Sequence, residues 1–492
     1  MISYNYQVPA HELLLPSPKS MEESGGLLKL HLGSAYALDE SFRPLAPLLE
    51  SQLGLNEGCE DVLLGRSPEP LPKEAYTLKV TKEQVVAKAS DIHGMFNAIQ
   101  TLRQLYLAND GLIPCCRIED APAFPWRGFM LDCSRHFFPV DEIKKLIDVA
   151  AMHHLNVFHW HLTDDQGWRF PVQGYPRLEE IASKRVDHAY TDGRTYGGFY
   201  SEADIKDVVQ FAEERMVTVV PEIECPGHAS ALLAAYPELG CSGGPYHVRD
   251  QWGIFPEVMC PGEEKVFAFM EAALDSLCRL FPGPYIHIGG DECPHTAWKS
   301  CPKCQKRMRE EGIANEDELQ GWFTTKIAEM VHARGKRCIG WDEVWEFAAK
   351  DSLPDDLIIM SWRGAEGGVS AAKQGHQIIM CPNTEGVYLD YRHTNDPNEP
   401  GNLGVSTIMQ TARFDPIKEG VDRSLVLGGQ GNLWTEKVPF GRMAEYLFYP
   451  RLAVIAERLW QPQDPAGLPD KLSWEGKKLD KLGVLSYRGP LE

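Results

Sequence analysis

Apolar runs and helical stretches alternate along the chain from about residue 126 to residue 460. Each apolar run is short and ends in polar or aromatic residues, which is typical of parallel strands buried on both faces. The runs occupy residues 127–132, 156–161, 217–222, 285–290, 337–341, 357–362, 376–380 and 425–429. Eight parallel strands close a (β/α)8 barrel, so this pattern predicts an α/β fold of the TIM-barrel type.

The segments between these runs carry apolar residues at helical spacing and are long enough for an outer ring of helices. They span residues 140–155, 202–216, 263–280, 317–335 and 442–460. After the sixth and seventh runs the helical pattern is short, at residues 369–375 and 416–420, so we expect an irregular barrel there. A doubly wound open sheet is the alternative, but it needs a switch point and a Gly-rich phosphate turn, and the sequence shows neither.

The chain before the barrel predicts a separate small α+β module. Residues 27–32 and 76–80 alternate like strands, and residues 94–107 carry a buried helical face. Two prolines in residues 119–125 favour a junction between domains. We therefore expect an accessory α+β domain over residues 1–122, a catalytic barrel over 123–462, and a Pro-, Gly- and Lys-rich tail over 463–492 packed on the barrel.

Composition narrows the function classes. The net charge of -21 argues against binding to nucleic-acid phosphates and favours a small neutral or weakly polar substrate. No apolar run is long enough for a membrane span, and residues 1–7 lack the pattern of a secretory signal, so a cytoplasmic location is expected. An odd count of 13 cysteines favours reduced thiols, although six bridges beside one free thiol stay possible.

Residues that suit carbohydrate chemistry follow the predicted strands, at the face where barrel active sites lie. They are Arg135, Asp164, Asp165, Glu222, Glu224, His228, Asp291, Glu292, Trp341, Asp342, Glu343, Trp362, Arg363, Tyr388, Asp390, Trp434 and Glu436. Carboxylates supply acid–base groups, and indole faces stack on sugar rings. Each residue alone is more often a packing or solvated residue, but a barrel rim has no general need for all of them together.

The sharpest local pattern is His-Ile-Gly-Gly-Asp-Glu at residues 287–292. The two glycines allow a close approach of the backbone to a ligand. Two adjacent acids in a partly apolar site repel each other, so their pKa values are expected to separate. Asp291 and Glu292 thus form a candidate pair of acid and charge stabiliser.

This motif, in order with the strand-end residues above, resembles the family 20 glycoside hydrolases, the β-N-acetylhexosaminidases. The resemblance covers nearly the whole chain, including the amino-terminal module. It implies an exo-acting retaining enzyme that removes terminal GlcNAc or GalNAc, with the substrate's own acetamido oxygen as nucleophile. No metal or other cofactor is implied; the expected partner is a small carbohydrate or glycoconjugate substrate, and the oligomeric state stays open.

The resemblance also implies roles for individual residues. Glu292 would protonate the glycosidic oxygen and later deprotonate water, Asp291 would stabilise the acetamido nitrogen, and Tyr388 would hydrogen-bond the acetamido oxygen. Trp341, Trp362 and Trp434 would wall the acetamide pocket, and Arg135, Asp390 and Glu436 would hold hydroxyls at the non-reducing end. Asp164 and His228 would support Asp291 from behind, with Asp164 preferred to Asp165 on spacing alone.

Two other function classes stay open at this point. His159 and His161 at a strand end resemble the His-x-His pair of metal-dependent barrel hydrolases, with His228 and Asp291 as further ligands. A sugar-binding protein without catalysis could use the same pocket, although binding alone needs no proton donor.

Two further groups are weighed and set aside. Asp342 and Glu343 could be the working acids, but no glycine pair precedes them. Cys301 and Cys304, with Cys293 and His295 upstream, could bind zinc, but a single Cys-x-x-Cys pair favours a reduced structural loop.

Overall fold

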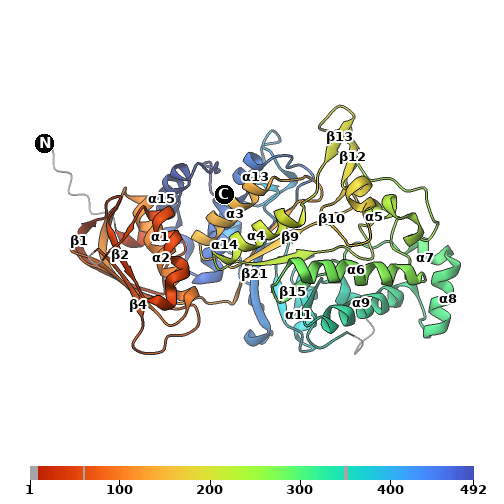
Figure 1. The fold of residues 1–492 in the computed structure, drawn as a ribbon, viewed down its shortest axis with the longest axis horizontal. Coiled ribbons are helices and arrows are strands. Elements are labelled where there is room, and N and C mark those ends of the chain that lie inside the picture. Colours follow the sequence, from red (N-terminus) through yellow and green to blue (C-terminus); the bar gives the residue numbers. More distant parts are fainter. Residues whose placement is uncertain (1–8, 59–60, 348–352) are drawn as a thin grey trace.

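A computed structural model describes residues 9–58, 61–347 and 353–492 and shows two bodies, an amino-terminal sheet domain and a larger barrel (Figure 1). Residues 1–7, which underlie the expectation of no secretory signal, lie outside the described residues. Within the described part of the chain, no helix combines the length and apolar character that crossing a membrane requires.

Eight parallel strands close the barrel in the order β14-β15-β16-β17-β18-β21-β8-β9. They are β8 (Trp126–Asp132), β9 (Val157–His161), β14 (Thr218–Glu222), β15 (Tyr285–His287), β16 (Arg337–Trp341), β17 (Ile358–Ser361), β18 (Ile378–Met380) and β21 (Val426–Leu433). Each expected apolar run overlaps one of these strands, so the predicted (β/α)8 barrel is confirmed.

The outer layer is helical but uneven. The main helices are α3 (Val140–Met152), α4 (Glu202–Glu213), α6 (Glu264–Leu280), α9 (Glu316–Ala333), α13 (Gly441–Phe448) and α14 (Arg451–Trp460). The single helix expected over residues 442–460 is wrong, because Pro450 lacks the N–H that a continuous helix needs and separates α13 from α14. The barrel is irregular where expected: only the short α11 (Glu366–Ala372) follows β17, and residues 416–420 are not helical.

Short elements fill the loops around the barrel, mostly at the carboxyl ends of its strands. They are β10 (Thr163–Asp164), β11 (Gly167–Trp168), β12 (Lys184–Asp187), β13 (Arg194–Gly197), α5 (Ser230–Ala235), α7 (Thr296–Ser300), α8 (Pro302–Glu311), α10 (Glu343–Glu346), β19 (Tyr391–Arg392), β20 (Asn402–Val405) and α12 (Ile408–Ala412).

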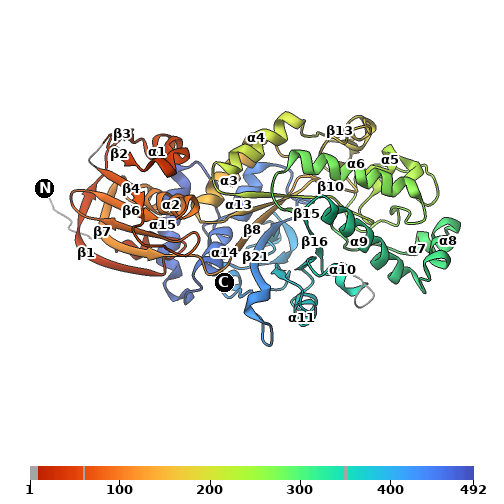
Figure 2. The ribbon, with the colours of Figure 1, turned by 60° about the horizontal axis from the view of Figure 1, so that its bottom comes forward.

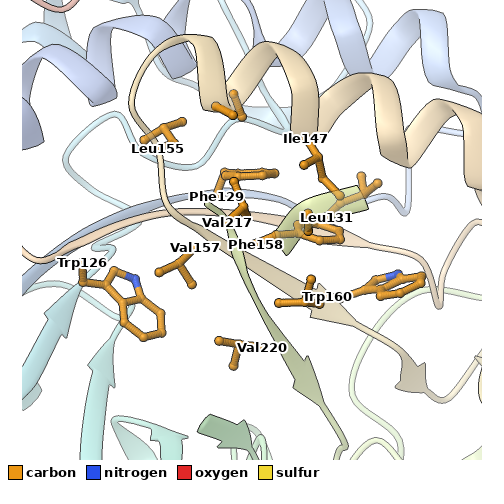
Figure 3. Close-up of a cluster of buried hydrophobic side chains, with 14 of the residues drawn as sticks. Trp126, Phe129, Leu131, Ile147, Leu155, Val157, Phe158, Trp160, Val217 and Val220 are labelled. Atoms are coloured by element: carbon orange, nitrogen blue, oxygen red, sulfur yellow. The ribbon is translucent and has the colours of Figure 1, made fainter. Parts of the chain in front are cut away.

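Large apolar side chains fill the space between the barrel strands and α3 (Figure 3). Phe129 of β8 stacks on Phe158 of β9 with ring centroids 5.2 Å apart, and Ile147 of α3 is fully buried in the same cluster. Burying one such side chain contributes about 1.5–3 kcal/mol. This packing explains why the strands read as continuous apolar runs: β8 is buried at every position.

The amino-terminal domain is a seven-stranded sheet in the order β1-β7-β5-β6-β4-β2-β3, packed with two helices. Its elements are β1 (Ser20–Lys29), β2 (Ala35–Leu38), α1 (Ala46–Leu53), β3 (Asn56–Glu57), β4 (Val62–Arg66), β5 (Tyr76–Val80), β6 (Val85–Ala89), α2 (Ile92–Ala108) and β7 (Leu112–Asp120). The expected α+β module is therefore present. The Asp91 side chain accepts a hydrogen bond from the Gly94 N–H and so caps α2.

The segment after residue 462 contains a 14-residue helix, α15 (Leu468–Lys481), which packs against α2 (Figures 1 and 2). Its Glu475 contacts His153, which follows α3 of the barrel, at 2.8 Å and Lys478 at 2.8 Å, and all three side chains are fully buried. Lys478 also donates to Gln104 of α2 at 2.6 Å. Burial disfavours the charge of Glu475, but Lys478 and His153 outweigh it and lower the pKa to about 2. The helix thus joins the two domains through buried charges.

Replacing Glu475 tests this junction. Glu475→Ala leaves Lys478 buried without its counter-charge, which typically costs about 3–5 kcal/mol. We expect a thermal unfolding midpoint lower by several degrees, measured by calorimetry. Ser473→Ala, at an exposed position of the same helix, is the control and leaves the midpoint unchanged. Equal midpoints for both variants would show that the buried charges do not stabilise the junction.

Candidate active site

A cavity that is open to solvent lies at the carboxyl ends of the barrel strands. It is lined by Arg135, Asp291, Glu292, Trp341, Trp362, Tyr388, Asp390, Tyr391, Asn402, Trp434 and Glu436. Every residue to which the family resemblance gives a role lines it except Asp164 and His228, which lie behind the carboxylate pair. Tyr391 and Asn402 were not expected.

The loop after β15 places the two adjacent carboxylates in the cavity. Gly289 has φ 65° and Gly290 has φ 98°, and Glu292 itself adopts the left-handed region with φ 45°. A Cβ on Gly289 would lie 1.9 Å from Glu224 Oε2, and one on Gly290 would lie 2.4 Å from Val344 Cγ1. The glycines therefore admit protein side chains beneath the loop, which differs from the close ligand approach expected from the sequence.

Asp291 and Glu292 lie in different surroundings. The Asp291 side chain is 11% exposed, whereas the Glu292 side chain is 33% exposed and faces the cavity. Burial raises the pKa of Asp291 to about 6; the positive charge of His228 opposes this shift, and the charge of Glu292 adds to it. Asp291 is therefore still mostly ionised at neutral pH.

His228 links the pair to a second layer of carboxylates. Its Nδ1 lies 3.0 Å from Asp165 Oδ2 and 3.2 Å from Asp164 Oδ1, and its Nε2 lies 3.6 Å from Glu292 Oε2. Burial disfavours its charge, but the negative charge of Asp164 and the contacts of Nδ1 with Asp164 and Asp165 raise the pKa of His228 well above its usual range. Asp164 and Asp165 share the supporting position, which spacing alone assigned to Asp164.

Asp164 also fixes Arg135. The guanidinium Nη2 lies 2.9 Å from Asp164 Oδ2, and the Arg135 side chain lies over the Trp434 ring, with its Cζ 5.1 Å from the ring centroid. Asp164 therefore supports both the carboxylate pair, through His228, and the Arg135 cation of the same lining.

Hydrogen bonds fix two of the three indole walls. Trp341 donates to Glu222 at 2.8 Å, and Trp362 donates to Glu343 at 2.9 Å. Trp362 also stacks near Tyr388, with ring centroids 6.3 Å apart. Because their N–H groups are directed away into the protein, the rings offer apolar faces to the cavity.

The remaining wall carries acids and an amide. Burial raises the pKa of Asp390 to about 8, and the nearby charge of Glu436 adds to the shift. Asn402 donates its side-chain N–H to Asp390 at 3.4 Å. Asn402 and Tyr391 were missed because they belong to β20 and β19 in a long loop, outside the strand-end pattern.

Several buried polar atoms of the lining have no hydrogen-bond partner within the described residues. They are Asp291 Oδ1, the Tyr388 hydroxyl, Asp390 Oδ1 and Glu436 Oε2. Buried polar groups are normally paired. The cavity therefore suits a compact ligand that carries several hydroxyl or amide groups.

The alternative catalytic groups lie outside this lining. His159 and His161 both contact the buried Glu222, the first at 2.9 Å. Asp342 and Glu343 pair with Arg363 at 3.4 and 3.3 Å. Glu224 lies beneath Gly289, and burial raises its pKa well above the usual range, next to the charge of Asp291.

The model of the glycosyl hydrolase family 20 catalytic domain matches residues 124–463, and the family's domain 2 matches residues 13–121. The chain belongs to glycosyl hydrolase family 20. The resemblance noted from the sequence is thereby confirmed. The similar proteins are glycosidases named β-hexosaminidase.

Known relatives agree over most of the chain. A β-hexosaminidase of Porphyromonas gingivalis is 38% identical over 99% of this chain, which spans 66% of that protein's length. A β-hexosaminidase of Vibrio furnissii is 35% identical over 90% of this chain and 76% of its own. The structure of a family 20 exo-β-N-acetylglucosaminidase of Vibrio harveyi in complex with N-acetylglucosamine matches with a TM-score of 0.88 at 30% identity, over 98% of this chain and 79% of its own.

The raised pKa of Asp291 predicts an effect on stability. Its folded pKa of about 6 lies above the ordinary 3.8, so ionising Asp291 destabilises the folded protein as pH rises through this interval. At pH 7 we expect the free energy of unfolding of Asp291→Asn to exceed that of the wild type by up to about 3 kcal/mol. Its thermal unfolding midpoint, measured by calorimetry, is therefore expected to be higher. Asp355→Asn, at an exposed aspartate, leaves the midpoint unchanged. A lower midpoint for Asp291→Asn would contradict the sign of the shift.

Proposed function

We propose that this family 20 enzyme removes terminal, non-reducing β-linked N-acetylhexosamine residues by substrate-assisted catalysis. The observation that carries the proposal is the placement of Asp291 and Glu292 as consecutive residues of one loop, both contacted by His228. In the two-carboxylate retaining scheme, acid and nucleophile flank the scissile bond from opposite sides, about 5–5.5 Å apart. Two consecutive carboxylates on one loop suit a different mechanism, in which one is the general acid and the other stabilises a nucleophile that belongs to the substrate.

In this mechanism Glu292 gives its proton to the glycosidic oxygen as the bond from C1 to that oxygen breaks. The acetamido oxygen of the same sugar forms a bond to C1, and the positive charge spreads to the acetamido nitrogen. The ionised carboxylate of Asp291 accepts a hydrogen bond from the N–H of that nitrogen and stabilises its charge. Water then forms a bond to C1 as the bond from C1 to the acetamido oxygen breaks, and it gives a proton to Glu292. Two inversions at C1 leave its configuration retained.

The other lining residues fit the acetamide and the hydroxyls. The Tyr388 hydroxyl has no partner among the described residues and is available to the acetamido oxygen. The faces of Trp341, Trp362 and Trp434 suit the acetamido methyl group and exclude water. Arg135, Asp390 and Glu436 supply polar groups for the ring hydroxyls, and a lining that holds the non-reducing end makes the enzyme exo-acting.

The nature of the sugar tests the mechanism. We expect hydrolysis of the nitrophenyl β-glycosides of N-acetylglucosamine and N-acetylgalactosamine, and at least about 10³-fold lower kcat/KM for the plain glucoside, which lacks the intramolecular nucleophile. Release of nitrophenol is followed by absorbance. Comparable cleavage of the glucoside would refute substrate assistance, and activity on no acetamido sugar would refute the proposed function.

Glu292→Gln separates catalysis from binding. The amide keeps the shape of the side chain but cannot donate the proton, so we expect kcat to fall about 10²–10⁴-fold on N-acetylglucosaminides with poor leaving groups. Binding of N-acetylglucosamine, measured by calorimetry, is expected to change only a few-fold. Glu346→Gln, an exposed glutamate of α10, is the control. Loss of binding equal to the loss of turnover would remove Glu292 from the acid role.

A further inference from the structure

Four cysteines from three separate segments meet at the end of the barrel domain farthest from the amino-terminal sheet, beside α7 and α8 (Figures 1 and 2). Cys241 and Cys260 bracket a long loop between α5 and α6, and Cys301 and Cys304 lie at the start of α8. Cys301 and Cys304 are the pair noted in the sequence. The partners suggested there are not the ones found, because His295 bonds to Asp317 and Gln320 instead.

The distances between the four sulfurs fit one shared metal ion. Cys260 Sγ lies 3.7 Å from Cys301 Sγ and 3.5 Å from Cys304 Sγ, and Cys241 Sγ lies 3.8 Å from Cys304 Sγ. All four sulfurs lie within 4.8 Å of one another. A tetrahedral zinc ion with Zn–S bonds of about 2.3 Å separates its sulfurs by about 3.8 Å, whereas a disulfide holds two sulfurs at about 2.0 Å.

The backbone around the cluster is arranged for thiolate ligands. Gly240 and Met259 form an antiparallel bridge, and the Cys260 N–H donates to the Leu239 carbonyl at 2.9 Å, so the backbone holds the two segments that carry Cys241 and Cys260 together. Gly262 packs against the start of α8, where a Cβ would lie 2.5 Å from the Cys304 nitrogen, and its N–H faces the Cys260 and Cys304 sulfurs. Amide N–H groups near the sulfurs stabilise the negative charge of a metal-bound thiolate.

We propose that Cys241, Cys260, Cys301 and Cys304 bind one structural zinc ion. Four thiolates complete the tetrahedral coordination of zinc and leave no position for water or substrate, so the ion has no part in the hydrolytic reaction. A multi-iron cluster needs wider sulfur spacing, because its irons and sulfides lie between the cysteines.

The position of the zinc site gives it a supporting role for the active site. Cys260, Cys301 and Cys304 share an apolar cluster with Cys293, the residue after Glu292, and with the fully buried Trp298. The Trp298 indole donates to the Met259 carbonyl at 2.9 Å, and Met259 N–H donates to the carbonyl of Pro226 at 2.9 Å. The ion would therefore fasten the loop of Cys241 and Cys260 to the segments that carry His228 and Glu292.

Metal analysis of the full chain, purified without chelator, tests the proposal. We expect one zinc ion per chain by inductively coupled plasma mass spectrometry, and almost none in the double variant Cys301→Ser/Cys304→Ser. Cys278→Ser, at a cysteine on α6 outside the cluster, is the matched control and retains the zinc. We also expect the double variant to unfold at a lower temperature than the control.

If the double variant does not fold, a second measurement on the wild-type protein still tests for the metal site. The wild-type protein is exchanged with Co²⁺, which is expected to give the strong near-ultraviolet thiolate-to-metal absorption and the visible bands of tetrahedral cobalt. Iron in place of zinc, cluster cysteines found in disulfides by mass spectrometry, or zinc retained by the double variant would each overturn the proposal. So would a wild-type protein with free thiols that takes up neither zinc nor cobalt.

Discussion

The carboxylate of Glu222 is the contact on which the barrel's interior and its active site both depend. It is fully buried at the end of β14, and it accepts contacts from His159 and His161 of β9, from His287 of β15 and from Trp341 of β16. Burial disfavours its charge, but the histidines hold the pKa of Glu222 well below its usual range. One anion thereby joins four neighbouring strands just beneath the cavity, and it sets the orientation of an indole that lines the cavity.

The two active-site loops after β14 and β15 depend on this buried contact because each contains a strained backbone conformation. His228 has φ 46° and Glu292 has φ 45°, and a non-glycine residue in such a conformation costs of order 1–3 kcal/mol. Close packing around Gly227 and Gly289 leaves these residues little room to relax: a Cβ on Gly227 would lie 3.1 Å from the Asp291 carbonyl oxygen. The stability of the barrel thus maintains a conformation that the local sequence disfavours.

The sequence allowed the barrel and most of the cavity to be predicted for a physical reason. Parallel strands buried on both faces read as continuous apolar runs, and their carboxyl ends must meet, so Arg135 and Glu436 could be assigned to one site although they lie 301 positions apart. Asn402 follows no such rule, since it reaches the cavity through an irregular loop. The sequence could not predict that Cys241 and Cys260 lie beside Cys301 and Cys304, because the four cysteines come from separate segments and no regular spacing along the chain connects them. The burial that raises the pKa of Asp291 also depends on tertiary packing.

The junction through α15 has a consequence for the order in which the protein is assembled. During synthesis the amino-terminal sheet and α2 are made first, and domains generally begin to fold as they emerge. The contact between α2 and α15 nevertheless cannot form until all eight barrel strands have been translated, because α15 follows them in the chain. Until then Gln104 lacks the lysine that contacts it in the finished protein. The early domain is thus held in an incomplete state by the timing of translation, and it reaches its final packing only together with the barrel.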